Sequence, residues 1–319
     1  MALLTYREAV IDIESGEDVL SALLRAEIDA RHSCRAGVCQ SCLHRAVEGQ
    51  PPPAAQEGLS DAQRSLGYFL ACLCRPETPL TIVPAQEAGD RFEVSVQAID
   101  RLAGDVIRLR LEHGPDFSYR PGQFVELIAE DGLGRHYSLA SHPEEDDFIE
   151  LHVRLYPGGR MSGLIAERLA PGRKMHVAGP LGTCIYEGID PDQPMCLVGS
   201  GTGLAPLVGI LRDAWRRGHR GSIRLYHGVR EPEGLYLHDQ LEALASERAN
   251  FNYVACALSA ASPEGGDVAQ AVLERENALA DTAFFLCGGE RLVTRLKREL
   301  YMKGASLKQL RSDAFVPAP

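Results

Sequence analysis

The fold is decided first by residues 33–42, which run Ser-Cys-Arg-Ala-Gly-Val-Cys-Gln-Ser-Cys. Gaps of four and two residues separate Cys34, Cys39 and Cys42, and a further cysteine follows at Cys72. This spacing is typical of four thiolates that hold a [2Fe–2S] cluster, with three ligands on one short loop and the last on a distant turn. Thiolates are soft ligands that suit iron and sulfide. The sequence therefore predicts an iron–sulfur centre in this part of the chain.

Zinc binding and disulfide formation are the other common uses of four cysteines. Structural zinc sites usually pair two Cys-x-x-Cys knuckles, and the second knuckle is missing here. A disulfide framework needs an oxidising compartment, and residues 1–10 do not have the pattern of a signal peptide. Within the iron–sulfur interpretation, Cys74 is the rival of Cys72 for the fourth ligand position, because only one residue separates them.

Length and charge narrow the class of protein. A chain of 319 residues is expected to fold into two or three domains. Its hydrophobic content of 45% and charged content of 24% are those of soluble globular proteins, and no apolar run is long enough to cross a bilayer. The formal net charge of −11 argues against a nucleic-acid partner, which would require clustered Lys and Arg. We therefore expect a soluble cytoplasmic protein with no membrane or nucleic-acid partner.

The first domain is expected to span residues 1–86. Residues 3–13 predict a hairpin, residues 15–18 a turn and helix start, and residues 80–83 a closing strand. Together with the cysteine loop, these elements resemble the β-grasp ferredoxin. In ferredoxins the last ligand follows Leu-Ala or Leu-Ser, as Cys72 follows Leu70 and Ala71. The resemblance therefore favours Cys72 over Cys74.

The second domain is expected to span residues 91–188. Many short alternating strands with Gly and Pro turns between them predict a small antiparallel β-barrel. One helix interrupts the strands, with Leu164, Ile165 and Leu169 expected to be buried and Pro171 expected to end it. The strands are expected over residues 92–99, 106–111, 123–128 and 150–155.

The third domain is expected to span residues 192–319. Strands and helices alternate along it, which predicts a doubly wound parallel sheet covered by helices, an α/β nucleotide-binding layer. The strands are expected over residues 195–198, 223–227, 251–257 and 283–287, and helices over 237–244, 268–276 and 292–303. The whole chain is therefore predicted to be an α+β multidomain protein.

Two motifs of the second domain suit a flavin. Residues 134–141 contain Arg135, which can bind a phosphate through two hydrogen bonds, and Tyr137, which can lie against a planar ring. Residues 157–162 place glycines before a helix start, where free amides and the positive end of the helix dipole suit a pyrophosphate. In this order on a barrel, the pair resembles the flavin domain of the ferredoxin–NADP⁺ reductase family.

The resemblance implies a role for each residue of these motifs. Arg135 and the backbone around Gly159, Met161 and Ser162 are expected to hold the flavin diphosphate. Tyr137 and Ser138 are expected to face the isoalloxazine ring. The glycine motif at the helix start favours FAD over FMN.

The third domain opens with residues 197–206, Leu-Val-Gly-Ser-Gly-Thr-Gly-Leu-Ala-Pro. Gly199, Gly201 and Gly203, with Thr202 between the last two, permit a tight turn between a strand and a helix. The spacing departs from the Rossmann Gly-x-Gly-x-x-Gly fingerprint. It is similar to the pyridine-nucleotide domain of the same reductase family, so these residues are expected to bind the coenzyme.

Two later positions also resemble that family. Cys287 and Gly288 match its Cys-Gly motif, in which the cysteine lies near the nicotinamide, although a buried hydrophobic Cys287 is the simpler alternative. Phe315 matches the aromatic residue that covers the flavin in the family, although such a residue can also just fill a groove. Together with Tyr137 and Ser138, these two side chains are expected to lie at the reacting atoms.

The residues after the second strand of the sheet bear on the choice of coenzyme. Glu231 or Glu233 would bind a ribose 2′-hydroxyl and repel a 2′-phosphate, whereas Arg230 would do the reverse. We expect NADH to be preferred over NADPH.

The three domains in this order resemble the reductase components of multicomponent bacterial oxygenases, such as benzoate dioxygenase, methane monooxygenase and phenol hydroxylase reductases. The resemblance implies an NAD(P)H-dependent oxidoreductase that passes electrons through FAD and a [2Fe–2S] cluster to the terminal component of an oxygenase. One alternative keeps this electron chain but serves a deoxysugar dehydrase or another protein acceptor. A second alternative is a redox-sensing or interaction module with a structural cluster.

Overall fold

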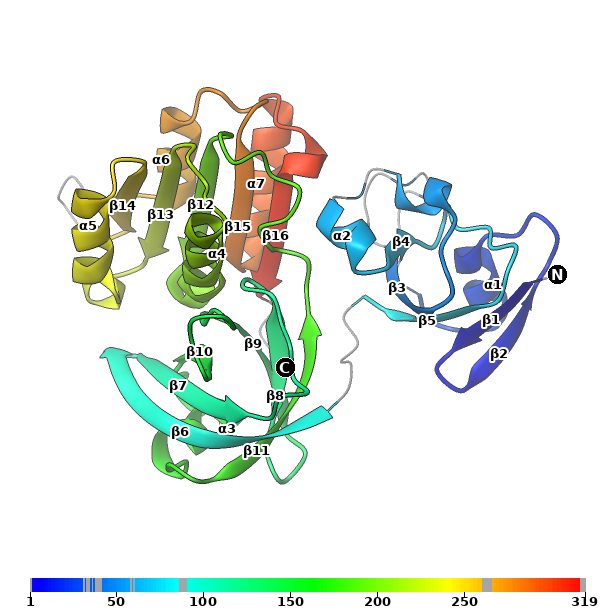
Figure 1. Ribbon diagram of the computed structural model, residues 1–319, viewed down its shortest axis with the longest axis horizontal. Coiled ribbons are helices and arrows are strands. Elements are labelled where there is room, and N and C mark those ends of the chain that lie inside the picture. The colour runs from blue at the N-terminus through cyan, green and yellow to red at the C-terminus, as the bar shows by residue number, and fades with distance from the viewer. Residues whose placement is uncertain are drawn as a thin grey trace. The chain divides into compact units, whose positions relative to one another are not determined.

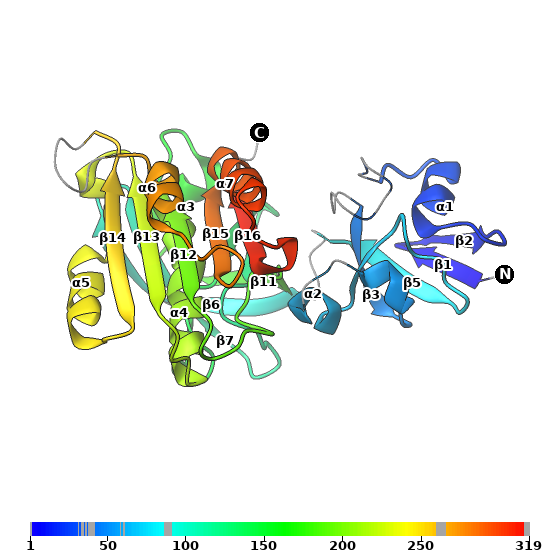
Figure 2. The ribbon, with the colours of Figure 1, turned by 90° about the horizontal axis from the view of Figure 1, so that it is seen from above.

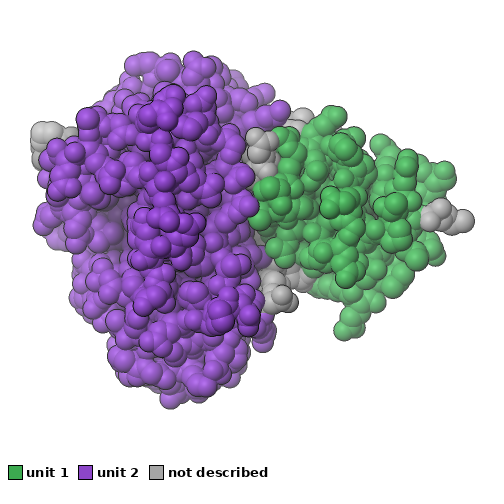
Figure 3. All heavy atoms as spheres, viewed as in Figure 1, with its two compact units in different colours: residues 1–87 green, residues 88–319 purple. Residues whose placement is uncertain are grey.

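The computed structural model describes residues 2–30, 32, 35, 37, 42–57, 59, 61–85, 91–259 and 266–315. The chain divides into two compact units, residues 1–87 and 88–319, which Figure 3 shows in green and purple. In the described parts of both units, no helix is long and apolar enough to cross a membrane.

Unit 1 is a five-stranded mixed sheet in the order β2-β1-β5-β3-β4, in which β1 and β5 run parallel. The first helix starts as the sequence predicts, because Asp18 caps it by accepting a hydrogen bond from the Ser21 amide at 2.9 Å. Leu20 and Leu23 of this helix share the core with Phe69, and burying each such side chain contributes about 1.5–3 kcal/mol. The elements are β1 (Ala2–Tyr6), β2 (Ala9–Ile13), α1 (Val19–Arg25), β3 (Leu43–Glu48), η1 (Pro53–Gln56), α2 (Asp61–Ser65), β4 (Tyr68–Leu70) and β5 (Leu80–Pro84). This arrangement is the expected β-grasp fold (Figure 1).

The first half of unit 2 is an antiparallel sheet in the order β10-β7-β6-β11-β8-β9. A bridge between Leu139, just after β9, and Leu151 of β10 brings the two edge strands together and closes the barrel. The elements are β6 (Arg91–Ala103), β7 (Val106–His113), β8 (Phe124–Ile128), β9 (Gly134–Ser138), β10 (Ile149–Arg154), α3 (Arg160–Glu167) and β11 (Lys174–Leu181). The predicted antiparallel barrel is confirmed.

The second half of unit 2 is a fully parallel sheet in the order β14-β13-β12-β15-β16. Its central strand, β12, is almost wholly buried, as a strand covered on both faces must be. Helices α4 and α5 pack into one core and α6 and α7 into another, so each face of the sheet is covered (Figure 2). The elements are β12 (Met195–Ser200), η2 (Gly201–Gly203), α4 (Leu204–Arg216), β13 (Ile223–Val229), η3 (Pro232–Gly234), α5 (His238–Glu247), β14 (Phe251–Ala257), α6 (Val268–Arg275), β15 (Ala283–Gly289), α7 (Glu290–Met302), η4 (Leu307–Gln309) and β16 (Leu310–Phe315). The predicted doubly wound layer is confirmed.

The structure differs from the sequence expectations in two places that matter for the site. Helix α3 ends at Glu167, because the carbonyl of Leu164 accepts from the amides of both Arg168 and Leu169 at 3.0 Å and closes the last turn. Ile165 is buried as expected, whereas Leu164 and Leu169 pack against the barrel core and are only partly buried. In addition, β16 is a strand where the sequence suggested only a chain ending, and it extends the parallel sheet at β15.

Candidate functional site

Two cysteines of the predicted cluster set are described, and they lie side by side in unit 1. The Sγ atoms of Cys42 and Cys72 are 3.2 Å apart, well beyond the roughly 2.05 Å of a disulfide bond. Both side chains are buried, one just before β3 and the other in the turn after β4. Cys34 and Cys39 lie outside the described residues. The described half of the set fits a group held by thiolates from two separate segments.

Backbone hydrogen bonds hold the turn that carries the fourth predicted ligand. The amide of Ala71 donates to the carbonyl of Cys42 at 3.0 Å, which ties the two cysteine segments together. The amides of Val19 and Leu20 donate to the carbonyls of Cys74 at 2.8 Å and Ala71 at 3.1 Å. Amides in the first turn of a helix lack intrahelical partners, so those of α1 are able to hold the segment that carries Cys72.

Cys74 is poorly suited to be the fourth ligand. Its side chain is fully buried, and this burial, with a smaller effect from the charge of Asp18, raises the pKa of the thiol to about 12. Metal ligands must be thiolates, and a thiol with a high pKa resists deprotonation. Cys72 as the fourth ligand stays a prediction.

The predicted flavin contacts of unit 2 lie on β9 and at the start of α3. The sequence placed the Arg-x-Tyr-Ser motif after a strand, and the motif itself forms the next strand, β9. Arg135 is partly buried, with Nη1 donating to the carbonyl of Gly134 at 2.7 Å. Burial raises the pKa of Tyr137, so its hydroxyl keeps its proton. Ser138, the last residue of the strand, is buried.

The start of α3 offers free amides to an anion. Gly159 is the N-cap, and the amides of Arg160, Met161 and Ser162 belong to the first turn, which has no intrahelical acceptors for them. The Ser162 hydroxyl is occupied locally, accepting from the Tyr156 amide at 3.2 Å. The backbone amides of this turn, and not the Ser162 hydroxyl, are therefore available to a diphosphate, as the sequence-based proposal requires.

Asp313 is a site residue that the sequence reasoning did not single out. The Oγ of Ser138 donates to its Oδ2 at 3.2 Å, and Asp313 pairs in register with Cys287 across β15 and β16. The contact joins the flavin-side strand to the carboxyl ends of two parallel strands, where doubly wound sheets bind their ligands. Its position two residues before Phe315 was the only signal in the sequence.

The ionisation of Asp313 gives a testable pH dependence. The residue is partly exposed, yet burial of its carboxyl group raises its pKa from 3.8 to about 6, against the opposing effect of the Ser138 hydrogen bond. A carboxyl group with a raised folded-state pKa stabilises the fold below its unfolded pKa, and this contribution is lost as the pH rises through about 6. As the pH is raised from about 4 to about 6, we expect the thermal unfolding temperature of the wild type to decrease relative to that of Asp313→Asn. Parallel pH profiles of the two proteins would contradict this.

The predicted nucleotide residues form a compact turn at the end of β12. Gly201 has a φ of +53°, in the left-handed region. Gly203 lies so close to β15 that a Cβ there would be 2.3 Å from the carbonyl oxygen of Cys287. At the end of β15, the amide of Gly289 donates to the Ser200 Oγ at 3.2 Å. Thr202 lies within the turn, and α4 begins directly after it, so the first amides of that helix point at the site.

Cys287 and Phe315 occupy the ends of the two neighbouring strands. Cys287 is closed to solvent, with its Sγ 3.6 Å from that of Cys184. Burial, followed by the effect of Cys184, raises its pKa well above that of an ordinary thiol. Phe315 is partly exposed and pairs in register with Gly289. Ser138 contacts Asp313 where β9 approaches β16, and Cys287 and Phe315 lie near the same ends of β15 and β16.

Arg154 is a second residue that the sequence reasoning missed. It lies on β10 of the barrel, and its Nε donates to Asp105 Oδ2 at 2.8 Å. Its Nη1 is 3.1 Å from where a Cβ of Gly201 would stand, so the guanidinium group lies over the glycine turn. An arginine at this place suits the pyrophosphate of a dinucleotide.

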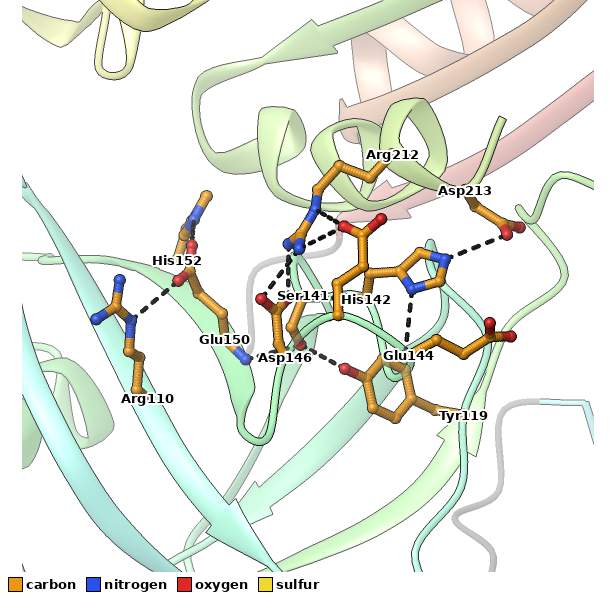
Figure 4. Close-up of polar contacts among 11 residues, drawn as sticks. Arg110, Tyr119, Ser141, His142, Glu144, Asp146, Glu150, His152, Arg212 and Asp213 are labelled. Atoms are coloured by element: carbon orange, nitrogen blue, oxygen red, sulfur yellow. Dashed lines mark hydrogen bonds and ion pairs between the residues drawn. The ribbon is translucent and has the colours of Figure 1, made fainter. Parts of the chain in front are cut away.

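Ion pairs join α4 of the nucleotide domain to the loop after β9 of the flavin domain, and Figure 4 shows those of Arg212. Arg212 of α4 donates to Asp146 Oδ2 at 2.6 Å and to Glu145 Oε2 at 2.8 Å, and Arg216 donates to Glu144 Oε2 at 2.7 Å. An exposed ion pair is worth at most about 1 kcal/mol, but here several share one loop. They hold residues 144–146 against α4.

Three known domain families match separate parts of the chain. A 2Fe-2S iron-sulfur cluster binding domain matches residues 5–77, an oxidoreductase FAD-binding domain matches residues 93–186, and an oxidoreductase NAD-binding domain matches residues 197–298. These matches confirm the cofactors predicted from sequence, namely a [2Fe–2S] cluster, FAD and a pyridine nucleotide.

Similar proteins cover almost the whole chain. The reductase subunit of an aromatic O-demethylase from Amycolatopsis sp. is 32% identical over 97% of this chain and 96% of that protein. Reductase component 1 of terephthalate 1,2-dioxygenase from Comamonas sp. is 30% identical over 95% and 94%. The crystal structure of an Amycolatopsis cytochrome P450 reductase has a TM-score of 0.70 and 30% identity, and 99% of each chain is covered. The similarity thus extends across both units.

Proposed function

This chain belongs to the family of oxygenase reductases in which a [2Fe–2S] domain precedes FAD-binding and NAD-binding domains, and we propose that it passes electrons from NADH to the terminal component of an oxygenase. The hydrogen bond from Ser138 to Asp313 is the observation that carries the proposal, because it brings the flavin-side strand to the nucleotide end of the parallel sheet. Relatives named for an O-demethylase and a dioxygenase support an oxygenase as the acceptor, rather than a deoxysugar dehydrase.

The cofactors set the order of electron transfer. Flavin accepts the two electrons of a hydride together and can release them singly, as a [2Fe–2S] cluster requires. The residues of the chain bind and orient these groups. The Ser138 hydroxyl, which donates to Asp313, would face the flavin ring, and the glycine turn and Arg154 would hold the pyrophosphate of the coenzyme.

We assign the remaining roles as the sequence suggested. The proposed cluster ligands are Cys34, Cys39, Cys42 and Cys72, the proposed flavin contacts are Arg135, Tyr137, Ser138, Gly159, Met161 and Ser162, and the proposed nucleotide contacts are Gly199, Gly201, Thr202, Gly203, Cys287 and Gly288. Phe315 is proposed to cover the flavin. The proposed domains are residues 1–86, 91–188 and 192–319, and a cytoplasmic location follows from the need for a pool of reduced pyridine nucleotide.

An anaerobic NADH titration tests the proposed function, with iron and flavin quantified on the same sample. Uptake of about three electrons per chain, two on the flavin and one on the cluster, is expected, with both visible bands bleaching. A cluster that stays oxidised after the flavin is reduced would contradict the proposed electron chain and favour a structural cluster instead.

Glu231 is the residue proposed to select NADH over NADPH. It follows β13, where the adenosine ribose is read in doubly wound domains. The hydroxyl of Ser259, beyond the end of the neighbouring strand β14, donates to the Glu231 carboxylate and holds it in place. The amide of Ser259 also donates to the carbonyl of Arg230 at 3.0 Å. These contacts favour Glu231 over Glu233 as the residue that excludes a 2′-phosphate.

Exchanging the carboxylate for an amide tests this assignment. In Glu231→Gln we expect kcat/KM for NADPH, relative to that for NADH, to rise about tenfold, because repulsion of the 2′-phosphate is removed. The matched control is Glu233→Gln, the same change two residues further along, which should leave the ratio unchanged. A ratio that responds to Glu233→Gln and not to Glu231→Gln would reverse the assignment.

A further inference from the structure

A row of buried and partly buried polar groups crosses unit 2 from the flavin barrel to the nucleotide domain. It begins at Glu150 of β10, whose Oε2 accepts from Arg110 Nε at 3.2 Å and whose Oε1 lies 3.0 Å from His152 Nε2 (Figure 4). Although burial alone raises the pKa of Glu150, the hydrogen bonds from His152 and Arg110 bring it below the ordinary value. Glu150 is thus held as a carboxylate that accepts hydrogen bonds from both neighbours.

The next member of the row is Tyr236, which belongs to the nucleotide domain. Its hydroxyl is 3.1 Å from His152 Nδ1, and both side chains are buried. Because a carboxylate only accepts hydrogen bonds, His152 donates from Nε2 to Glu150 and turns its other ring nitrogen, Nδ1, toward the tyrosine. A hydrogen bond between Tyr236 and His152 thus crosses the boundary between the two domains.

The row ends at the glycine turn. His227 of β13 is fully buried, and its Nε2 lies 3.1 Å from the carbonyl oxygen of Gly201. Burial lowers the pKa of His227 to about 4, so the neutral ring donates from Nε2 to this carbonyl. Nδ1 has no hydrogen-bond partner among the described residues. The ring of Tyr236 meets that of His227 edge to face, with 5.4 Å between the ring centres.

We propose that Tyr236 is the positioning residue that ties the glycine turn of the nucleotide domain to the flavin barrel. Its hydroxyl is fixed by His152 of the barrel, and its ring supports His227, which holds the carbonyl of Gly201. This inference rests on the proposed function, since the tie sets the nicotinamide at the correct place relative to the flavin. Tyr236 acts through its contacts with His152 and His227.

A matched pair of variants tests this inference on the full chain. Tyr236→Phe removes only the hydroxyl, and Tyr186→Phe makes the same change at a second buried tyrosine, whose hydroxyl also lies 3.1 Å from a histidine Nδ1, that of His219. Both variants lose one buried hydrogen bond, so both should lose similar stability. Only Tyr236 is joined to the glycine turn.

The first readout is hydrogen exchange of the peptide covering residues 197–206, measured without nucleotide. We expect exchange there to rise several-fold in Tyr236→Phe and to stay at the wild-type rate in Tyr186→Phe. The second readout is anaerobic flavin reduction at saturating NADH. Its limiting rate should fall roughly tenfold in Tyr236→Phe with FAD content unchanged, because the turn is displaced.

A further variant breaks the same hydrogen bond from the side of the barrel. His152→Phe removes the hydrogen-bond partner of Tyr236 and keeps an aromatic ring. Its effect on hydrogen exchange at the glycine turn should not add to that of Tyr236→Phe, because both variants break the same hydrogen bond. Equal exchange at the glycine turn in the Tyr236 and Tyr186 variants would overturn the inference. If the wild type fails to reduce its flavin with NADH while the exchange difference persists, the proposed function fails and the tie stands.

Discussion

Cys72→Ala is expected to purify without its iron–sulfur cluster and to lose all NADH-dependent reduction of a protein acceptor. Four thiolates are needed to hold two irons, and Cys72 lies 3.2 Å from Cys42, a second predicted ligand. Reduction of a small dye that takes electrons directly from the flavin should continue, because unit 2 has its own cores. Iron content, cluster absorption and the two activities measured on one preparation check this result.

The control for this variant lies two residues further along the same turn. Cys74→Ala makes an identical change at another buried cysteine, which shares the hydrophobic core of unit 1. A buried free cysteine behaves as a small apolar side chain, so this variant should keep its iron and its electron transfer at a modest loss of stability. Loss of iron from the Cys74 variant, with retention in the Cys72 variant, would exchange the two assignments.

Gly203→Ala is expected to slow NADH-dependent flavin reduction about 100-fold, because displacing a bound reactant by about 1 Å has effects of this size. An added Cβ would stand 2.3 Å from the carbonyl oxygen of Cys287 and 2.7 Å from its carbonyl carbon. Both are backbone atoms at the end of β15, so the glycine turn must move away from the strand. FAD and iron content should stay at wild-type values, since neither predicted site includes this turn.

Gly289→Ala provides the comparison for that variant. Gly289 is at the end of the same strand, but an added Cβ would meet nothing within 4 Å and its φ is negative. It should reduce its flavin at the wild-type rate. Stopped-flow measurement over a range of NADH concentrations separates a change in coenzyme affinity from a change in the limiting rate. Wild-type kinetics in Gly203→Ala would remove the turn from the coenzyme site.

Most of the correct predictions came from residues that lie close together in the sequence. The cysteine gaps and the Gly-x-Gly-Thr-Gly run each describe a short loop whose chemistry is set by neighbours in the chain, so residues 33–42 and 197–206 pointed to the correct cofactors. Strands were also located from neighbouring residues, because apolar residues alternate along β7 and run continuously along β12.

The missed features depend on partners far away in the chain. Strand β16 has the sequence Leu-Arg-Ser-Asp-Ala-Phe, which lacks an apolar period, and it forms because β15 offers it an edge. Asp313 gains its role only through Ser138, 175 residues earlier. Arg154 looks like an ordinary barrel residue until β10 is placed beside the glycine turn. Such contacts follow from tertiary packing, which no local pattern encodes.

The ion pairs between α4 and the loop after β9 have a consequence for protein engineering. Arg212 and Arg216 fit the order Glu144, Glu145 and Asp146, so each half of this junction is shaped to the other. A chimera that takes its coenzyme half from a relative would carry a foreign α4 against this acidic loop, leaving carboxylates that repel one another. Transplanting residues 144–146 together with α4 keeps each carboxylate with its arginine partner, so the practical unit of exchange crosses the domain boundary.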